Sequence, residues 1–161
     1  MNTIEQKLVK ASGKYVTTEH VDTLIRNYKK ERWLQNSERI GKEDTLGLWL
    51  TTDELEEFIQ TAKLHGANSI RVCFGVYGEK GGRPGMEGKQ TVALVAASGE
   101  GDDPRSMVFN DVYVERNGSS SLLAYNVLYP ETTPTGPVNN PPHITLGAMM
   151  VADKEKGLHV I

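Results

Sequence analysis

A glycine-rich stretch that ends in Gly-Lys, GEKGGRPGMEGKQT at residues 78–91, is the first candidate for chemistry. Phosphate-binding loops of the G-x-x-x-x-G-K-[ST] type open a helix and bind nucleotides through backbone N–H groups, a lysine and a hydroxyl. Here Gln90 follows Gly88-Lys89 where the hydroxyl belongs, and Arg83 takes the place of the first glycine. A strand pattern, not a helix, comes next. The stretch is therefore expected to be an exposed, flexible connection between two strands.

Four residues in and beside this stretch are the candidate ligand-binding residues: Arg71, Tyr77, Arg83 and Lys89. Arg71 lies within an apolar run, so its guanidinium needs a partner or solvent. Tyr77 would share its face of the strand, and the other two belong to the loop. Together they predict a site for a small anionic ligand. The alternative for Arg71 is a solvent-facing ion pair with a carboxylate of a neighbouring strand.

The other reactive side chains do not form a recognisable catalytic or metal-binding pattern. His20, His65, His143 and His159 do not pair at the i, i+2 or i, i+4 spacing that places two ligands on one element. Cys73, the single cysteine, lies mid-strand and is expected to be a small buried packing residue. A G-x-S-x-G nucleophile motif does not occur in the sequence. We therefore predict no catalytic residue, no metal and no cofactor.

Two charged segments have ordinary explanations. Residues 99–103, GEGDD, lack the alternating ligands and closing glutamate of a calcium loop, which favours a solvated loop. Residues 26–32 carry basic side chains beside Tyr28 and Trp33, a combination that can bind nucleic acid. The solvated face of a helix is the expected role, because the net charge of -3 argues against a general nucleic-acid binder.

The first element expected to position these residues is a helix. Thr17 or Thr18 is its predicted N-cap. Apolar side chains recur at helical spacing at Val21, Leu24, Ile25 and Tyr28. We expect the helix to run to about Leu34 and to be broken at residues 36–37 or at Gly41.

A second helix has the clearest boundaries in the sequence. Thr51 and Glu54 form a T-x-x-E capping box, and Leu50 can contact Leu55 as a hydrophobic staple. Gly66 is expected to end the helix as its C′ residue.

Strands dominate the rest of the chain. Residues 69–77 alternate, and one face, expected to be buried, carries Ile70, Val72, Phe74 and Val76. Residues 91–97 are a nearly continuous apolar run and predict a more buried strand. Shorter strands are expected at residues 107–109, 112–114 and 122–128, with a turn at Asn117-Gly118, and residues 46–50 are a strand or an extended lead-in to the second helix.

Helices followed by strands predict an α+β fold, with the N-terminal helices packed on one face of a mainly antiparallel sheet. The 161 residues, 38% of them hydrophobic, fit a single domain over 1–161. We expect a polar N-terminal segment at 1–16 and a proline-rich loop at 130–143, while 144–151 could be helix or strand. The sequence has no run of apolar residues like a signal peptide or membrane span, which predicts a cytoplasmic protein.

The segment from Leu46 to Gly78 combines an aromatic strand, a capped LEEFI helix and the strand SIRVCFG, followed later by Tyr125-Asn126 and Pro141-Pro142. With these motifs, residues 18–98 resemble a group of small bacterial α+β proteins that have a GIRVYFG-like strand and no known activity. In that group cysteines flank the later Pro-Pro pair, whereas this chain has only His143 there. The resemblance implies a fold, and any metal or redox role of those cysteines would not carry over.

Two functional hypotheses follow. The first is a non-catalytic domain that binds a small anionic ligand or a protein partner. The second is an enzyme of unfamiliar type acting on a small anionic or phosphate-containing substrate, with charged groups drawn from Arg71, Lys89, Asp102, Asp103 and His143. A homodimer joined through a sheet edge or the first helix is compatible with either.

Overall fold

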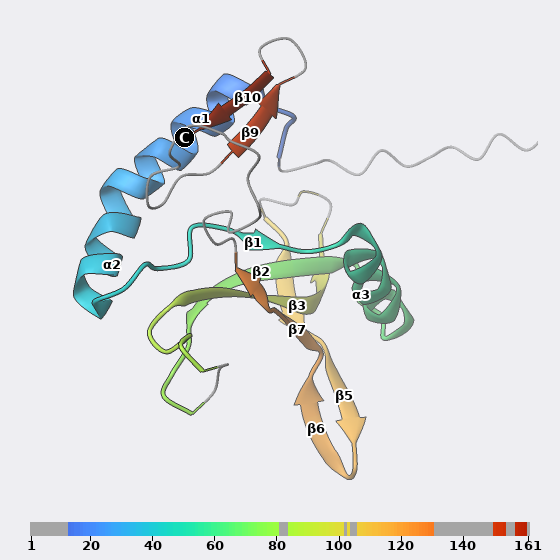
Figure 1. Cartoon of the computed structure of the whole chain (residues 1–161). Coiled ribbons are helices and arrows are strands. Elements are labelled where there is room, and N and C mark those ends of the chain that lie inside the picture. Colours follow the sequence, from blue (N-terminus) through green and yellow to red (C-terminus); the bar gives the residue numbers. More distant parts are fainter. Residues whose placement is uncertain are drawn as a thin grey trace, which may run out of the picture.

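The computed structural model describes residues 13–80, 84–101, 103, 106–130, 150–153 and 157–160. Two helical regions come first and antiparallel strands follow, so the predicted α+β class is confirmed (Figure 1). The elements are α1 (Thr18–Tyr28), the π-helical turn η1 (Lys29–Trp33), α2 (Leu34–Ile40), β1 (Leu48–Trp49), α3 (Thr52–Leu64), β2 (Ser69–Val76), β3 (Gln90–Glu100), β4 (Val108–Asp111), β5 (Tyr113–Arg116), β6 (Ser119–Leu122), β7 (Ala124–Val127), β8 (Tyr129–Pro130), β9 (Met150–Asp153) and β10 (Gly157–Val160).

The first helix is longer than the sequence predicts. Thr17 is its N-cap, because its hydroxyl accepts a hydrogen bond from the His20 N–H at 3.2 Å. The helix does not stop near Leu34 but continues through η1 and α2 to Ile40. Gly41 ends it in the left-handed conformation, with a φ of 71°, so of the two predicted breaks the glycine is the correct one.

The π-helical turn η1 explains how this helix keeps one face inward. Trp33 follows Tyr28 by five residues, which is about 1.4 turns of a regular α-helix and would place the two side chains on different faces. The turn instead closes with a hydrogen bond from the Leu34 N–H to the Lys29 carbonyl, five residues back. This wider turn brings Trp33 into the interior, where only 2% of its surface is exposed.

Helix α3 begins as predicted. The Thr51 hydroxyl accepts from the Glu54 N–H at 3.1 Å, and the Glu54 carboxylate accepts from the Thr51 N–H at 3.0 Å. The Tyr125 hydroxyl also donates to Glu54 at 2.7 Å and, together with the Thr51 bonds, lowers the pKa of this carboxyl group. Gly66, with a φ of 84°, follows the end of the helix.

We expect Thr51→Ala to lower the free energy of unfolding by about 1 kcal/mol, because the Glu54 N–H loses its capping acceptor. Thr52→Ala, one residue on at an exposed position, is the matched control and should change it by less than about 0.5 kcal/mol. Urea denaturation followed by circular dichroism measures both. Equal losses in the two variants would contradict the role of the cap.

The sheet is built on β3, which is its central strand among the described residues. β2 pairs along one side of β3, from Ser69 opposite Ala97 to Val76 opposite Gln90. β4 and β7 pair antiparallel with successive parts of its other side. Between them the chain leaves the sheet as the β5–β6 hairpin, which protrudes from the body of the molecule (Figure 1). Asn117 and Gly118 both have positive φ at its tip, which confirms the predicted turn.

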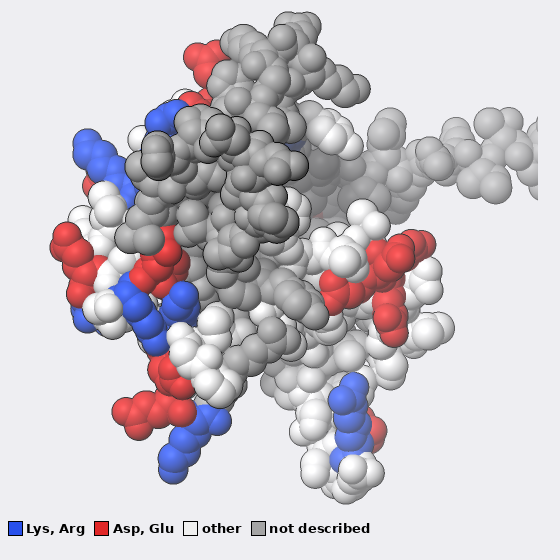
Figure 2. All heavy atoms as spheres, viewed as in Figure 1, with Lys and Arg blue, Asp and Glu red and all other residues white. Residues whose placement is uncertain are grey.

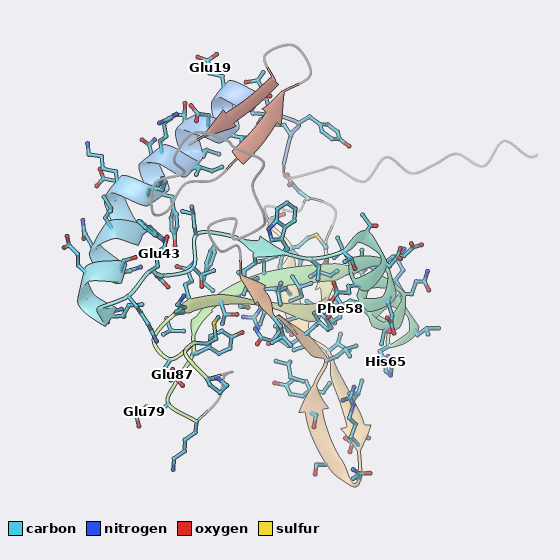
Figure 3. The ribbon with its side chains drawn as sticks, viewed as in Figure 1. Glu19, Glu43, Phe58, His65, Glu79 and Glu87 are labelled. Atoms are coloured by element: carbon cyan, nitrogen blue, oxygen red, sulfur yellow. The ribbon has the colours of Figure 1, made fainter. Side chains whose placement is uncertain are left out.

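One face of the sheet carries the core, and α3 covers only part of it. Phe58 and Ala62 of α3 pack against core residues of the sheet, namely Leu94, Ala96 and Val127. Figure 3 shows Phe58 on the side of α3 that faces the sheet. The apolar side chains of β2 lie on this same face, and Ile70 packs against the core.

The prediction that the whole apolar face of β2 is buried is wrong. Val72, Phe74 and Val76 are exposed. The reason is geometric, since the core formed by α3 reaches the Ile70 end of the strand while the opposite end borders a hollow. Alternation in the sequence shows which face is apolar, but it does not show how far the covering helix extends.

Three predicted segments lie wholly or partly outside the described residues. The predicted N-terminal segment is described only from residue 13, and the proline-rich loop only at Pro130, which pairs with Leu48 through β8. Of the run 144–151, residues 150 and 151 belong to strand β9, which pairs with β10. None of the described helices is both long and apolar enough to cross a membrane.

Candidate functional site

A cavity of about 530 Å³ lies between the first helix and the core face of the sheet. Its roof is the apolar stripe of α1, one side is the chain leading into and past β1, and its floor is β3 with parts of β2 and β7. The lining residues are Leu24, Ile25, Tyr28, Thr45, Leu46, Gly47, Leu48, Leu50, Phe74, Gln90, Val92, Leu94 and Val127. None of these described lining residues is charged.

Protein interiors usually pack densely, so a hollow of this size beside the core is unusual. No residue of α1 is buried, although its apolar stripe points at the sheet. The stripe therefore faces a hollow instead of interlocking with β3. A volume of about 300 to 1,000 Å³ with a mainly apolar wall is typical of small-molecule sites. Leu24 and Phe74 are exposed lining residues and mark its mouth.

Two polar side chains on the wall bond to each other. The Tyr28 hydroxyl donates to Gln90 Oε1 at 2.8 Å and so joins α1 to the start of β3. Burial, with a smaller contribution from the charge of Asp44, raises the pKa of Tyr28. A tyrosine hydroxyl is protonated at neutral pH even without this shift, so it can donate this hydrogen bond.

Asp44 holds the segment before β1 against the sheet. Its buried carboxylate oxygen Oδ1 accepts from the Thr45 N–H at 2.8 Å and from the Gln90 N–H at 2.7 Å. Its backbone carbonyl accepts from Trp33 Nε1 at 2.9 Å, and its N–H donates to the Ser37 hydroxyl oxygen. One residue thus joins η1, α2 and β3, and fixes where Thr45 lies.

The Thr45 hydroxyl is buried beside the cavity and has no hydrogen-bond partner among the described residues. Only 4% of its surface is exposed. Its N–H is bonded to Asp44, but its side-chain oxygen Oγ1 is buried without a hydrogen-bond partner among the described residues. A buried hydroxyl in this state is destabilising and calls for an explanation.

Arg71 and Tyr77, two of the residues predicted to bind an anion, lie on the opposite face of the sheet, apart from this cavity. Arg71 Nη2 forms an ion pair with Asp111 Oδ2 at 2.6 Å, and both side chains are partly exposed. This is the arrangement described above as the alternative for Arg71. Arg71 and Tyr77 are six residues apart along an extended chain, or about 20 Å at roughly 3.3 Å per residue, so they do not converge.

Tyr77 belongs to a closed ring of hydrogen bonds. Its hydroxyl donates to Asn126 Oδ1 at 3.0 Å, Asn126 Nδ2 donates to Thr91 Oγ1 at 2.9 Å, and Thr91 Oγ1 donates back to the Tyr77 oxygen at 3.0 Å. Asn126 Nδ2 also donates to the Val92 carbonyl. Since each donor of these side chains is already used, the ring joins β2, β3 and β7 rather than presenting donors to an anion.

The glycine-rich loop is anchored on its second half. Lys42 Nζ donates to the Gly85 carbonyl at 3.0 Å and lies 3.7 Å from Glu87 Oε2. Lys89 is half-buried at the foot of the loop, where its carbonyl accepts from the Tyr77 N–H. Figure 3 places Glu79 and Glu87 on this loop, far from α3. Arg83 lies outside the described residues.

Other candidate groups do not assemble into a site. Cys73 is half-buried in β2, not fully buried as expected. Within the part of the chain that the structure describes, no three His, Cys, Asp or Glu side chains gather closely enough to hold a metal ion. His65 lies at the C-terminal end of α3, and its ring nitrogen Nδ1 is 2.9 Å from the Thr61 carbonyl oxygen (Figure 3).

Charge is distributed unevenly over the surface seen in Figure 2. Acidic side chains gather over α3, whose exposed positions include Asp53, Glu56 and Glu57. On the side of α1 and α2, basic and acidic side chains alternate. Tyr28 and Trp33 both point inward from this helix, so neither aromatic ring accompanies its basic side chains at the surface.

The sequence interpretation missed the residues that shape the cavity. Tyr28 was placed on the apolar stripe, but its contact with Gln90 spans 62 positions and leaves no local signal. Asp44 and Thr45 lie in a short connection without a motif. The one available hint was the Asp-Thr pair directly before the apolar run 46–50. Short polar side chains next to a core often form hydrogen bonds with backbone groups.

Comparison of the chain with protein-family models, with curated proteins and with solved structures gives no match.

Proposed function

We propose that this chain is a non-catalytic ligand-binding domain, and that its ligand is a small, mostly apolar molecule held in the cavity under α1. The cavity of about 530 Å³ is the observation that carries this proposal. The hollow is open at its mouth, so its apolar wall is in contact with water. A bound apolar molecule would remove that apolar surface from water, which is favourable. The cytoplasmic location expected from the sequence is retained as part of the proposal.

The proposal favours an apolar ligand over the anion predicted from the sequence. Arg71, the best candidate for anion binding, is neutralised by Asp111, and Tyr77 has its donor in use. No charged side chain lines the described walls of the cavity. An anionic ligand at Arg71, Tyr77, Arg83 and Lys89, a protein partner, and a homodimer through a sheet edge or the first helix stay predictions.

The enzyme alternative needs charged groups that converge on one pocket. Arg71 is paired on the outer face of the sheet, and Lys89 lies at the foot of the loop. Asp103 is in the turn after β3, where its carbonyl accepts from the Ser106 N–H. Asp102 and His143 lie outside the described residues. The described groups therefore give this alternative less support than the cavity gives to ligand binding.

Titration with N-phenyl-1-naphthylamine, a neutral apolar fluorophore, tests the proposal. We expect saturable binding with one site per chain and about tenfold weaker binding to Leu24→Glu. Leu24 lies at the mouth of the cavity, and a carboxylate there removes apolar contact area and places a charge beside an apolar ligand.

Leu34→Glu is the matched control, because Leu34 is 50% exposed and Leu24 is 54% exposed, and Leu34 does not line the cavity. Both variants should fold, since neither side chain is buried. Equal weakening by the two substitutions, or fluorescence that rises without saturation in the wild type, would contradict the proposal.

A further inference from the structure

We propose that the ligand of this cavity is an uncharged molecule with an apolar body and a hydrogen-bond acceptor, such as a ketone or an ester, and that the carboxamide of Gln90 donates to this acceptor. The inference rests on the proposed function and adds the chemical class of the ligand. Three observations support it: the place of Gln90 on the wall, the surplus of donors in its contact with Tyr28, and the negative charge of Asp44 next to this pair.

Gln90 brings a polar side chain to the apolar face of the sheet. It is the first residue of β3 and lies two positions before Val92, so both side chains leave the same face of the strand. Both residues line the cavity, and Gln90 is half-buried. The backbone N–H of Gln90 donates to Asp44 Oδ1 at 2.7 Å, which fixes the backbone from which the side chain extends. Gln90 is therefore a polar residue held in place at the wall.

The side chains of Tyr28 and Gln90 have more donors than their hydrogen bond uses. The Tyr28 hydroxyl donates to Gln90 Oε1, and Gln90 Nε2 has no hydrogen-bond partner among the described residues. Nε2 is accessible, because Thr45 Oγ1 is the one described side-chain N or O atom that is both buried and without a partner. If the amide oxygen and nitrogen of Gln90 exchanged places, Nε2 would donate to the Tyr28 oxygen. Either orientation leaves two donors of the pair free.

Free donors on an apolar wall favour a ligand that carries an acceptor. In the ligand-free cavity, which is open at its mouth, water can accept hydrogen bonds from these groups. A ligand that displaces this water without supplying an acceptor leaves the donors unpaired, which weakens its binding. A carbonyl oxygen accepts hydrogen bonds and has no donor of its own, so it matches the carboxamide of Gln90. The rest of such a ligand contacts leucine, isoleucine, valine and phenylalanine side chains of the wall.

The charge beside this pair disfavours an anionic acceptor. Asp44 Oδ1 accepts from the Gln90 N–H, and after burial the charge of Asp44 is the second cause that raises the pKa of Tyr28. Burial and this charge both oppose a negative charge at the Tyr28 hydroxyl, and they act in the same way on a ligand carboxylate at Gln90. The described wall has no cationic side chain to offset them. We therefore expect a ketone to bind and a carboxylate of similar shape to be rejected.

The test compares three competitors of the neutral fluorophore that share two phenyl rings. Diphenylmethane is apolar, benzophenone has a carbonyl in place of the methylene group, and diphenylacetate carries a carboxylate. We expect the ratio of benzophenone affinity to diphenylmethane affinity to fall about tenfold in Gln90→Met, whose side chain has a similar length and no donor. Because both proteins are measured with the same two ligands, differences in ligand solubility cancel in the comparison. On the wild type at neutral pH, diphenylacetate should compete about tenfold more weakly than benzophenone.

Tyr28→Phe is the matched control, because it removes the other polar group of the pair and keeps the carboxamide of Gln90. This variant should keep the benzophenone preference of the wild type. Infrared spectroscopy of isotope-labelled benzophenone gives a second readout that does not depend on a folded variant. A hydrogen bond from Gln90 should lower the frequency of the carbonyl stretching band in the wild-type complex relative to an alkane solvent. If Gln90→Met does not fold, Gln90→Leu supplies the same comparison.

The outcomes separate the two proposals. Failure of the fluorophore and of every competitor to bind the wild type would overturn the proposed function. Saturable binding with an unchanged benzophenone-to-diphenylmethane ratio in Gln90→Met, or a wild-type carbonyl band at its alkane frequency, would overturn the role of Gln90 and leave the cavity as an apolar site. An equal loss of the preference in Tyr28→Phe would also overturn it. Competition by diphenylacetate equal to that of benzophenone would overturn the uncharged class of ligand.

Discussion

Replacing Trp33 by alanine should lower the free energy of unfolding by about 4 kcal/mol. Trp33 is 2% exposed, and its Nε1 donates to the Asp44 carbonyl at 2.9 Å. The substitution removes a large buried side chain and leaves a cavity. It also leaves the Asp44 carbonyl without its hydrogen-bond donor. Because η1 is fixed through Trp33, α1 loses its anchor, and we expect fluorophore binding to weaken in the folded fraction as well. Denaturant titration followed by far-ultraviolet circular dichroism measures the stability.

Two further variants separate packing from hydrogen bonding at this position. Trp33→Phe keeps most of the buried ring and loses the Nε1 donor, so its cost should be about 1 to 2 kcal/mol. Trp49→Ala removes the same side chain from β1, where it is 65% exposed, and should cost less than about 1 kcal/mol. If Trp33→Ala were no more destabilising than Trp49→Ala, the anchoring role of Trp33 would be wrong.

Trp33 is also the position in the first helix whose burial could not be predicted from the sequence. The stripe Val21, Leu24, Ile25 and Tyr28 has the period of a regular α-helix and correctly locates α1. That period predicts the next inward residue three or four positions after Tyr28, whereas Trp33 comes five positions after it. The wider π turn occurs together with the hydrogen bond from Trp33 to Asp44, which lies 11 positions further along the chain. A local pattern cannot report a register change that a tertiary contact imposes.

Elements whose boundaries depend on neighbouring residues were predictable. The capping box of Thr51 and Glu54, the end of α3 at Gly66 and the turn at Asn117-Gly118 each satisfy backbone groups within a few positions. The pairing of β2 with β3 agrees with the connection between two strands that the sequence predicts for the glycine-rich stretch. The caps and the turn depend only on neighbouring residues. These features are local, so the sequence carries their full signal.

The candidate site lies where α3 leaves the apolar face of the sheet uncovered. The extent of this uncovered part cannot be predicted from the alternation of apolar and polar residues alone. Ile70 and Phe74 lie on the same face of β2, yet Ile70 packs on the core and Phe74 borders the cavity. The difference comes from the reach of α3 and from how α1 is held above the sheet by Tyr28 and Gln90. The sequence predicted a ligand site at Arg71 and Tyr77 because charged and polar residues stand out in an apolar strand. A cavity, by contrast, produces no pattern in the sequence.

The second large effect is expected at Asp44, which fixes the wall of the cavity as Trp33 fixes its roof. Asp44→Ala should lower the free energy of unfolding by about 3 kcal/mol, because the Thr45 and Gln90 N–H groups lose their shared acceptor Oδ1. Asp44→Asn retains an acceptor oxygen at this position and should cost less than half as much. Denaturant titration of the three proteins at one pH compares them directly.

Asp111→Ala is the matched control, since it also removes a carboxylate with a short contact, 2.6 Å from Arg71. That pair is partly exposed, so its loss should cost less than about 1 kcal/mol. The difference between the two aspartates would arise from where they lie, because Asp44 is buried and Asp111 is partly exposed. If Asp44→Ala and Asp111→Ala were equally mild, Asp44 would not hold the segment before β1 in place.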